Sequence, residues 1–300
     1  MKKRLVIFAH YDKDEVIDEY VVQYLRELKK FASDIVFVSD GYLKSDEIEK
    51  IQPLVSEVIA QKHREYDFGS YKIGFFLLNS KYKEKLLNCD EVIFANDSCY
   101  LIRSLDPVFA TMEEKNLDFW GLARSYQYEV NHVHSYFFAF SRQLFLSDIV
   151  RDFFNKVTAE KTKENIIKKY EIGLSKLIND SGYKVGSFLG DINVSVLGNE
   201  IPMKKIILQN FPFLKIGAFV SGCYSVTKFE KIAGADNYRI IINNLLRRIG
   251  INDLMDYYKN LTLYRKFFFH RKFFAIFLKR GKLMIKLFGV TFFSLRLKGE

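Results

Sequence analysis

Cysteines, prolines and long apolar runs are scarce in this sequence, and these scarcities limit the kinds of protein that it can be. The three cysteines, Cys89, Cys99 and Cys223, show no paired spacing, so the sequence indicates neither a disulfide framework nor a structural zinc site. Only four prolines occur, and no low-complexity stretch or internal repeat is found. No uncharged apolar run approaches the ~20 residues that a membrane-spanning helix needs.

Two nucleotide-binding fingerprints and a secretory signal are also missing. No Gly-x-Gly-x-x-Gly motif follows the first apolar run, which argues against a dinucleotide-dependent oxidoreductase, and no P-loop is found. The amino-terminal apolar stretch, residues 5–9, is too short for a secretory signal and predicts a first strand instead. We therefore expect a cytoplasmic location.

The charge is unevenly distributed along the chain. Lysine and arginine outnumber aspartate and glutamate by 46 to 36, yet eleven of the basic residues fall between Asp256 and Glu300, where no acidic residue occurs. The first 256 residues are therefore close to neutral, and the excess positive charge belongs to the tail. Nucleic acid is not expected as a partner, because the positive charge is not spread over a folded surface.

The tail has a pattern that predicts a basic amphipathic helix. Basic residues recur every seven positions, at 265, 272, 279 and 286, and phenylalanine and leucine side chains occupy the other side of a helical projection. Such a helix suits an anionic membrane surface, where each cation contributes roughly 1 kcal/mol. We therefore expect a main domain over residues 1–235 and a helical, Phe-rich membrane-surface segment over residues 236–300. A terminal helix packed on the body, or RNA binding, remains an alternative.

The main domain shows an alternation of strands and helices that is typical of a parallel sheet. Strands are predicted over residues 4–9, 34–39, 55–60, 91–95, 118–123, 133–140, 185–188 and 192–196. Helices are predicted over residues 14–31, 45–51, 69–79 and 104–116, and they dominate from residue 144 to 178.

One strand ends in a polar tripeptide. Residues 91–95 form a short apolar run, and Asn96, Asp97 and Ser98 follow at its carboxyl end, which is where α/β sheets place ligands. A carboxylate at that point can hold a divalent cation that neutralises a diphosphate. An ordinary turn after a strand is the alternative for this tripeptide.

Several ordered motifs occur over the first two thirds of the chain. They are the segments 9–14 (Ala-His-Tyr-Asp-Lys-Asp), 17–20, 64–72 (Arg-Glu-Tyr-Asp-Phe-Gly-Ser-Tyr-Lys), 96–98, 118–122, 132–137, 171–175 and 212–215. Together these motifs resemble the rhamnan synthesis protein F family, and the resemblance extends to about residue 216. In the segment at residues 132–137 this chain has His134 where the family pattern has Gln.

This resemblance implies an α/β fold of the GT-A type, which is Rossmann-like, with a mixed sheet flanked by helices. It implies a glycosyltransferase that moves a sugar, expected to be rhamnose, from a nucleoside diphosphate sugar such as dTDP-rhamnose. The acceptor is expected to be a lipid-linked or polymeric saccharide in cell-wall or lipopolysaccharide synthesis. With the basic tail, we expect the protein to lie peripherally on the inner face of the plasma membrane.

The implied fold places the nucleotide over the carboxyl ends of the first strands. The residues expected to bind the donor are His10, Tyr11, Asp12, Asp40, Arg64, Tyr66, Gly69, Ser70, Lys72, Asn96 and Asp97, and Asp97 is expected to hold Mg²⁺ or Mn²⁺. Arg64 and Lys72 suit phosphate oxygens, Tyr66 can stack on the base, and the helix start near Gly69 can face an anion. Helix capping by Asp12, a turn at Asp40 and a pairing of Lys72 with Glu65 or Asp67 are the alternatives.

Sugar transfer also requires a base that takes a proton from the acceptor hydroxyl. The candidates are Asp118, His132, His134 and Glu171, and their spacing does not choose among them. His132 and His134 fall on the same face of a predicted strand, where both can reach the acceptor or both can bind a metal. Trp120, His132 and Tyr136 are expected to contact the acceptor, although Trp120 suits the core equally well.

Two other functions remain open at this point. One is a phosphosugar or phosphoryl transferase of the same pathway, which would release a phosphorylated product. The other is a non-catalytic, membrane-associated scaffold of a polysaccharide assembly complex, in which Asp97 would bind no metal.

Overall fold

The computed structural model describes residues 2–192, 197, 200–221, 230 and 232–249, together with three segments at 274–279, 282–287 and 290–296. Its contacts divide the chain into two compact units, Met1–Asn244 and Leu245–Glu300. The first unit contains all the residues that position the site described below.

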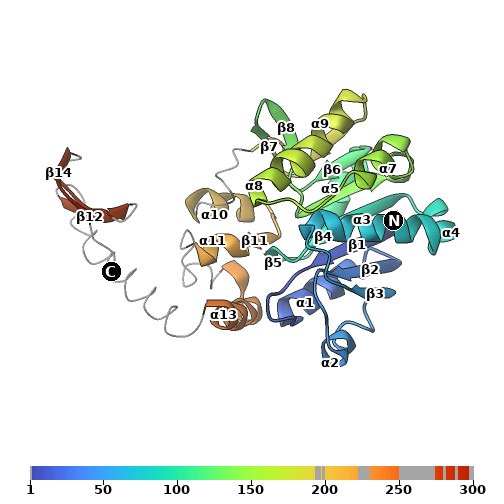
Figure 1. The fold of residues 1–300 in the computed structure, drawn as a ribbon, viewed down its shortest axis with the longest axis horizontal. Coiled ribbons are helices and arrows are strands. Elements are labelled where there is room, and N and C mark those ends of the chain that lie inside the picture. The colour runs from blue at the N-terminus through green and yellow to red at the C-terminus, as the bar shows by residue number, and fades with distance from the viewer. Residues whose placement is uncertain are drawn as a thin grey trace. The chain divides into compact units, whose positions relative to one another are not determined.

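A seven-stranded mixed sheet forms the centre of the first unit, in the order β10-β6-β9-β4-β1-β2-β3 (Figure 1). Strands β4, β1, β2 and β3 are mutually parallel, whereas β9 runs antiparallel to both β4 and β6. The central strands are short apolar runs that the sheet buries on both faces, as expected for parallel strands. The seven strands are β1 (Arg4–His10), β2 (Asp34–Ser39), β3 (Glu57–Ala60), β4 (Glu91–Asn96), β6 (Phe119–Gly121), β9 (Phe137–Ser141) and β10 (Val185–Ser187).

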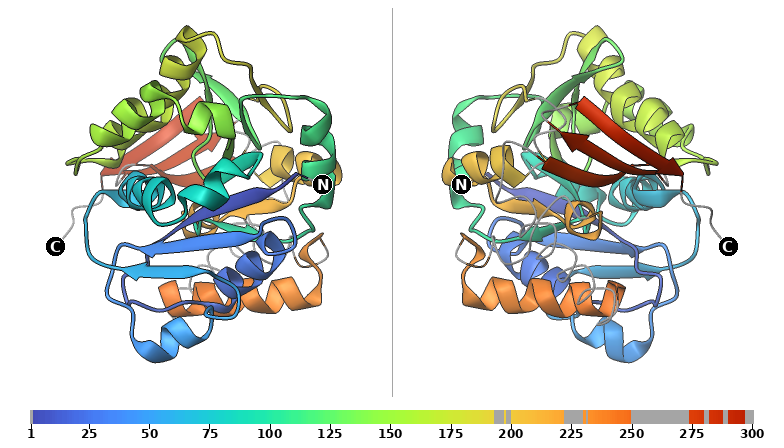
Figure 2. Two further views of the ribbon diagram at one scale, coloured as in Figure 1. Left: turned by 90° about the vertical axis from the view of Figure 1, so that its right-hand side faces the viewer. Right: turned by 90° about the vertical axis from the view of Figure 1, so that its left-hand side faces the viewer.

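Helices cover both faces of this sheet (Figure 2). On one face, α3 (Tyr66–Ser80), α7 (Asp148–Asn155) and α9 (Gly173–Asp180) contribute to a core cluster with side chains of β1, β2 and β4. On the other face, Tyr24 of α1 (Glu19–Leu28) contacts Phe8, and Phe109 of α5 (Asp106–Glu114) contacts Trp120. The sheet is thus the middle layer of three.

The packing of α3 on the sheet is unusually close. A Cβ atom built on Gly74 would lie 2.3 Å from Cγ2 of Ile7 on β1, so only glycine fits at this point of the helix. The close approach brings the first turn of α3 to the edge where β1 and β4 end, which places Tyr66 and Asp67 beside the ends of those strands.

Shorter elements complete the first unit, and the last of them, α13, continues past Asn244, where this unit ends. They are α2 (Ser45–Glu49), α4 (Lys83–Leu87), β5 (Cys99–Leu101), β7 (Arg124–Gln127), β8 (Val130–Val133), α6 (Arg142–Phe145), α8 (Lys163–Ile166), the π-helix η1 (Ile167–Ile172), α10 (Glu200–Leu208), β11 (Phe213–Lys215), α11 (Ile216–Val220) and α13 (Ala235–Ile249). Helix α13 runs beside α1, where Asn244 donates a hydrogen bond to Asp18 and Asn237 accepts one from Gln23.

The predicted fold class of the main domain, a mixed α/β sheet flanked by helices, is confirmed. The strand predicted over residues 34–39 matches β2, and the helix predicted over residues 69–79 lies within α3. The single strand predicted over residues 133–140 is wrong in one respect, because the segment is divided between β8, which pairs with β7 in a separate two-stranded sheet, and β9 of the main sheet. His134, Ser135 and Tyr136 occupy the gap between these two strands. The segment predicted as a strand over residues 192–196 lies mostly outside the described residues.

The described part of the second unit is a three-stranded antiparallel sheet of β12 (Phe274–Lys279), β13 (Lys282–Leu287) and β14 (Val290–Arg296). The prediction of an amphipathic helix is therefore wrong over these residues, although α13 is helical. Each pair of successive strands is separated by two residues, Arg280-Gly281 and Phe288-Gly289, a spacing typical of β-hairpins. The seven-residue spacing of basic residues therefore does not reflect a helix over these described residues. The rest of the predicted helix, and the boundary predicted after residue 235, remain predictions.

Among the residues that the structure describes, no helix is long and apolar enough to cross a membrane.

Candidate active site at the carboxyl edge of the sheet

The polar side chains predicted to bind the donor do gather at one edge of the sheet. The register pairs His10 with Ser39 and Ala9 with Asn96, so β1, β2 and β4 end together. Asp97 follows β4 and Asp40 follows β2 directly, and both are buried. The carboxyl ends of parallel strands thus bring residues from three distant parts of the sequence to one place.

Asp97 is turned toward the end of β1. Its Oδ2 accepts a hydrogen bond of 3.2 Å from the Tyr11 amide and lies 3.8 Å from Nε2 of His10. Nδ1 of His10 is 3.0 Å from the Ser39 hydroxyl, and the Tyr20 hydroxyl donates to the Asp97 carbonyl. These contacts fix the carboxylate at the mouth of the β1 loop.

Asp12 and Asp40 both accept hydrogen bonds from backbone amides in loops. The turn expected at Asp40 is consistent with this, whereas the alternative of helix capping by Asp12 is wrong, because α1 begins at Glu19 with Asp18 as its N-cap. Oδ1 of Asp12 accepts from the Asp14 amide, which forms a turn over the Lys13 position. Oδ1 of Asp40 accepts from the amides of His63 and Arg64 at 2.8 and 3.0 Å. Asp40 therefore holds the loop that leads into α3, in which Arg64 has a left-handed backbone with φ of 61°.

Gly69, Ser70 and Lys72 of the predicted donor site contact other parts of the protein, and these contacts do not support a direct contact with a donor. Gly69 and Ser70 are buried beneath His63: a Cβ on Gly69 would lie 2.5 Å from the His63 ring, and the Ser70 hydroxyl is 3.0 Å from its Nε2. Nζ of Lys72 donates to the Val157 carbonyl at 2.8 Å and pairs with Glu65 at 3.3 Å. These contacts favour the alternative pairing of Lys72 over a phosphate contact.

A cavity of about 470 Å³ opens at the end of β4, on the side of Asn96. Its walls come from the start of α3, the loop between β8 and β9, the segment α8–η1 and the turn from β11 into α11. The polar residues that line it are Tyr66, Asp67, Asn96, Ser98, Gln127, His134, Ser135, Tyr136, Lys163, Glu171, Lys215 and Ser221. The volume suits a small-molecule ligand.

Asp67 and Asn96 meet in the wall of this cavity. Nδ2 of Asn96 donates to Oδ2 of Asp67 at 2.7 Å, and Oδ1 of Asn96 accepts from the amide and hydroxyl of Ser98. Burial raises the pKa of Asp67 to about 6, against the opposing effects of Lys163 and Lys215. A carboxyl group that titrates near neutrality in a cavity is a candidate for proton transfer. Sequence reasoning missed this role, because only the fold reveals the burial.

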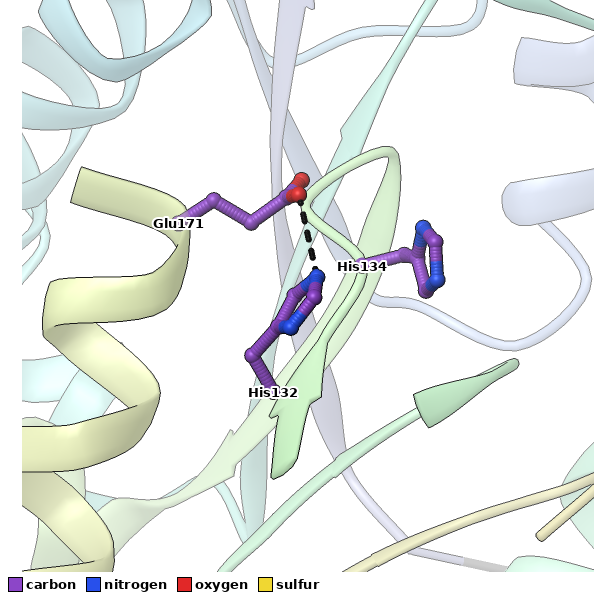
Figure 3. A group of neighbouring side chains, drawn as sticks. All are labelled: His132, His134 and Glu171. Carbon is purple, nitrogen blue, oxygen red and sulfur yellow. Dashed lines mark ion pairs between the residues drawn. The ribbon is translucent and has the colours of Figure 1, made fainter. Parts of the chain in front are cut away.

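His132, His134 and Glu171 lie close together, as Figure 3 shows, and the last two of them line the same cavity. Oε1 of Glu171 is 3.5 Å from Nε2 of His132, and its Oε2 accepts from the Ser135 amide at 2.7 Å and from the Ser135 hydroxyl. Burial alone would raise the pKa of Glu171, but His132, His134 and the Ser135 hydrogen bonds lower it to about 2. Burial lowers the pKa of His134 to about 4, so at neutral pH an ionised carboxylate faces a neutral imidazole.

The structure separates Asp118 and Trp120 from this site. Asp118 accepts hydrogen bonds from the Ser141 hydroxyl and the Lys184 amide, and Ser141 pairs with Glu91 at the amino end of β4. Asp118 therefore lies at the opposite edge of the sheet and is removed as a base candidate. Trp120 is only 1% exposed and donates to Glu91, so it belongs to the core and offers no face to a sugar.

A mixed sheet with a polar cavity at the carboxyl edge of its parallel strands is an arrangement typical of α/β domains that bind small molecules. The chain belongs to the rhamnan synthesis protein F family, whose model matches residues 35–277. It is also 20% identical over 244 residues to the uncharacterized protein y4gN of Sinorhizobium fredii, covering 80% of this chain and 62% of that protein. The chain thus spans about three-fifths of the length of this curated relative.

Solved structures to which the chain shows a weaker similarity include one transferase and two synthases. Core-mannan synthase A from Aspergillus fumigatus, in its Mn/GDP form, is 13% identical, with a TM-score of 0.39 and coverage of 63% of this chain and 73% of that one. Mannose-1-phosphate geranyltransferase from Thermus thermophilus is 9% identical, with a TM-score of 0.37 and coverage of 62% and 73%. A 4-diphosphocytidyl-2C-methyl-D-erythritol synthase is 11% identical, with a TM-score of 0.40 and coverage of 69% and 97%.

Proposed function

We propose that this protein is a glycosyltransferase that moves a sugar from a nucleoside diphosphate sugar to a saccharide acceptor in cell-surface polysaccharide synthesis. The observation that carries the proposal is the cavity at the end of β4, which joins Asn96, Asp67 and Glu171 in a chain of the rhamnan synthesis protein F family. Rhamnose as the sugar, dTDP as the nucleotide and a lipid-linked or polymeric acceptor belong to this proposal.

In this proposal the donor diphosphate lies between the β1 loop and the cavity, beside Asp97. The Asp97 carboxylate, fixed by the Tyr11 amide and facing His10, suits Mg²⁺ or Mn²⁺, which commonly use one or two protein carboxylates and complete their coordination with phosphate oxygens. Such an ion would neutralise the charge that develops on the leaving diphosphate. His10, Tyr11, Asp12, Asp40 and Arg64 then lie on the nucleotide side, and Tyr66 lies where that side meets the cavity, whose wall it lines.

The acceptor occupies the cavity, and Asp67 takes the proton from its hydroxyl. Asp67, with a pKa of about 6, is largely ionised at neutral pH and still has a substantial affinity for a proton. Glu171, with a pKa of about 2, is a much weaker base. Asn96 orients Asp67 through the 2.7 Å hydrogen bond. Lys163 and Lys215 line the same cavity and supply positive charge to the reacting groups. Tyr136, with the Lys215 ammonium 5.1 Å from its ring centroid, contributes an apolar wall for the sugar.

The test is a product analysis with the purified chain, a panel of nucleoside diphosphate sugars and saccharide acceptors. We expect formation of a new glycoside together with release of the nucleoside diphosphate, and at least a hundredfold loss of rate in Asp67→Asn. Release of pyrophosphate or of a sugar phosphate instead of a glycoside would assign the chain to nucleotidyl or phosphosugar transfer. Turnover of no donor, in a chain that stays folded, would contradict the proposal and favour the scaffold.

A further inference from the structure

The cluster of His132, His134 and Glu171 has a composition and geometry that transition metals prefer. Each residue offers one ligand atom, and these atoms all lie within 4.8 Å of one another. Two imidazoles and one carboxylate form a common ligand set for zinc and for other divalent transition metals. The spacing of His132 and His134 alone suggested this only weakly, because the carboxylate comes from a distant part of the sequence, in the π-helix η1.

His132 is the residue that ordinary packing does not explain. It is only 1% exposed, and within the part of the chain that the structure describes neither of its ring nitrogens has a hydrogen-bond partner. The 3.5 Å between its Nε2 and Oε1 of Glu171 is too long for a good hydrogen bond. A buried imidazole without hydrogen bonds costs free energy, and a bound cation would remove that cost. Two ligands of a tetrahedral zinc ion are ~3.4 Å apart, which is close to the observed separation.

The other two ligands are held in place by neighbours, as metal ligands usually are. The Ser125 hydroxyl is 2.7 Å from Nε2 of His134, which leaves Nδ1 of that ring for a metal. Ser135 holds Oε2 of Glu171 by its amide and hydroxyl, which leaves Oε1 directed at His132. His134 and Glu171 also line the cavity, so a metal at this point would have open coordination positions facing the ligand space.

We propose that His132, His134 and Glu171 bind a divalent transition-metal ion in the cavity wall, at a site separate from Asp97. Because the three ligand atoms lie within 4.8 Å of one another, no separation needs to contract by more than about 1.4 Å to reach the ~3.4 Å between two ligands of a tetrahedral ion. The three side chains carry a single negative charge, and the ion turns this part of the wall positive. The wall then attracts an anionic or hydroxyl-bearing part of the cavity ligand. This site is independent of the proposed glycosyl transfer.

The test is calorimetric titration of the chelator-treated full chain with ZnCl₂, together with visible absorption of the Co²⁺ form. We expect one equivalent of Zn²⁺ to bind and a Co²⁺ spectrum typical of nitrogen and oxygen ligands. Both should be lost in His134→Gln and Glu171→Gln. Both should be retained in Asp97→Asn and in His63→Gln, a histidine of another loop that serves as the matched control.

A folded-state readout keeps the result interpretable. Zn²⁺ should raise the melting temperature of the wild type and of His63→Gln but not that of His134→Gln, whose metal-free melting temperature should stay close to that of the wild type. Unchanged Zn²⁺ stoichiometry in His134→Gln, or no stoichiometric binding to the wild type, would overturn the proposal. Because no donor sugar is used, these outcomes are distinct from failure of the glycosyltransferase assay.

Discussion

Two carboxylates in one cavity wall have opposite protonation behaviour because their neighbours differ. Asp67 is half-buried and accepts a hydrogen bond from the Asn96 amide, and desolvation raises its pKa to about 6. Glu171 is held by Ser135 and faces two histidines, and its pKa is lowered to about 2. Pairs of acids whose environments separate their pKa values in this way are typical of sites that transfer protons.

The Asp67→Asn variant should be more stable than the wild type at neutral pH. The folded pKa of about 6 exceeds the unfolded value of 3.8, so the folded protein binds more protons between these values and wild-type stability falls as the pH rises from about 4 to about 6. Removing the carboxylate should raise the free energy of unfolding by up to about 3 kcal/mol above pH 7 and should leave it unchanged below pH 4. Urea unfolding of both proteins across this pH range measures the difference. If the free energy of unfolding depended on pH equally in both, the effect assigned to burial of Asp67 would be contradicted.

The Glu171→Gln variant should behave in the opposite way in the presence of a chelator. The folded pKa of about 2 lies below the unfolded value of 4.5, so the charge stabilises the fold above pH 4.5, and this contribution is lost as the pH falls toward 2. In urea unfolding at pH 7 we expect the free energy of unfolding of Glu171→Gln to be about 3 kcal/mol lower than that of the wild type. This difference between the two proteins should become smaller at acid pH. Asp180→Asn, which removes an exposed pair with Lys176, should change stability little. A similar loss in both variants would show that the effect is not specific to the cavity.

At the scale of elements, the sequence predicted the strands whose apolar runs are short and bounded by polar residues. The strand at residues 34–39 and the polar end of β4 follow from local pattern alone. The break between β8 and β9 does not, because residues 133–140 are continuous in strand propensity and the break depends on β8 pairing with β7 rather than with the main sheet.

The same distinction explains which site residues were predictable. His10 is the last residue of β1 and Asp97 directly follows β4, so their meeting follows from parallel strand order. Asp67, Ser135 and Lys215 act through burial and long-range contacts, which no local pattern contains. Trp120 was assigned to the acceptor because an aromatic ring suits both a core and a sugar, and only the observed exposure of 1% decides between them.

Helix α3 should tolerate no side chain at its contact with β1. In Gly74→Ala the added Cβ would lie 2.3 Å from the Ile7 side chain, and the helix or the strand must shift, at a cost of about 1–3 kcal/mol. Gly173→Ala is the matched control, because the nearest atom to its Cβ is 3.5 Å away and alanine favours a helix. Thermal unfolding of both variants checks this, and a Gly74→Ala protein as stable as the wild type would show that α3 packs less closely than described.

At the scale of the whole molecule, a neutral body is joined to a strongly basic tail. The described part of that tail is a β-sheet rather than a helix. The positive charge of the tail, eleven basic and no acidic residues between Asp256 and Glu300, is the same in either secondary structure. We propose that the tail holds the protein at an anionic membrane surface, where each cation near the headgroups contributes roughly 1 kcal/mol.

Truncation after Ile249 should separate membrane binding from the site. The full chain should cosediment with vesicles that contain anionic lipid, less so at high salt, and the truncated chain should remain in the supernatant while keeping its fold. The compact unit that contains the cavity ends at Asn244, so the truncation leaves that unit intact. Equal sedimentation of both chains would remove the tail as the membrane contact.

The central claim is that the carboxyl edge of the sheet binds a nucleoside diphosphate sugar beside Asp97. The direct measurement is calorimetry of the purified chain with a panel of such sugars, dTDP-rhamnose included, with and without Mg²⁺ or Mn²⁺. We predict metal-dependent binding of one donor, lost in Asp97→Asn but retained in Asp118→Asn, which alters the opposite edge of the sheet. Binding of no donor, or binding that survives Asp97→Asn unchanged, would contradict it.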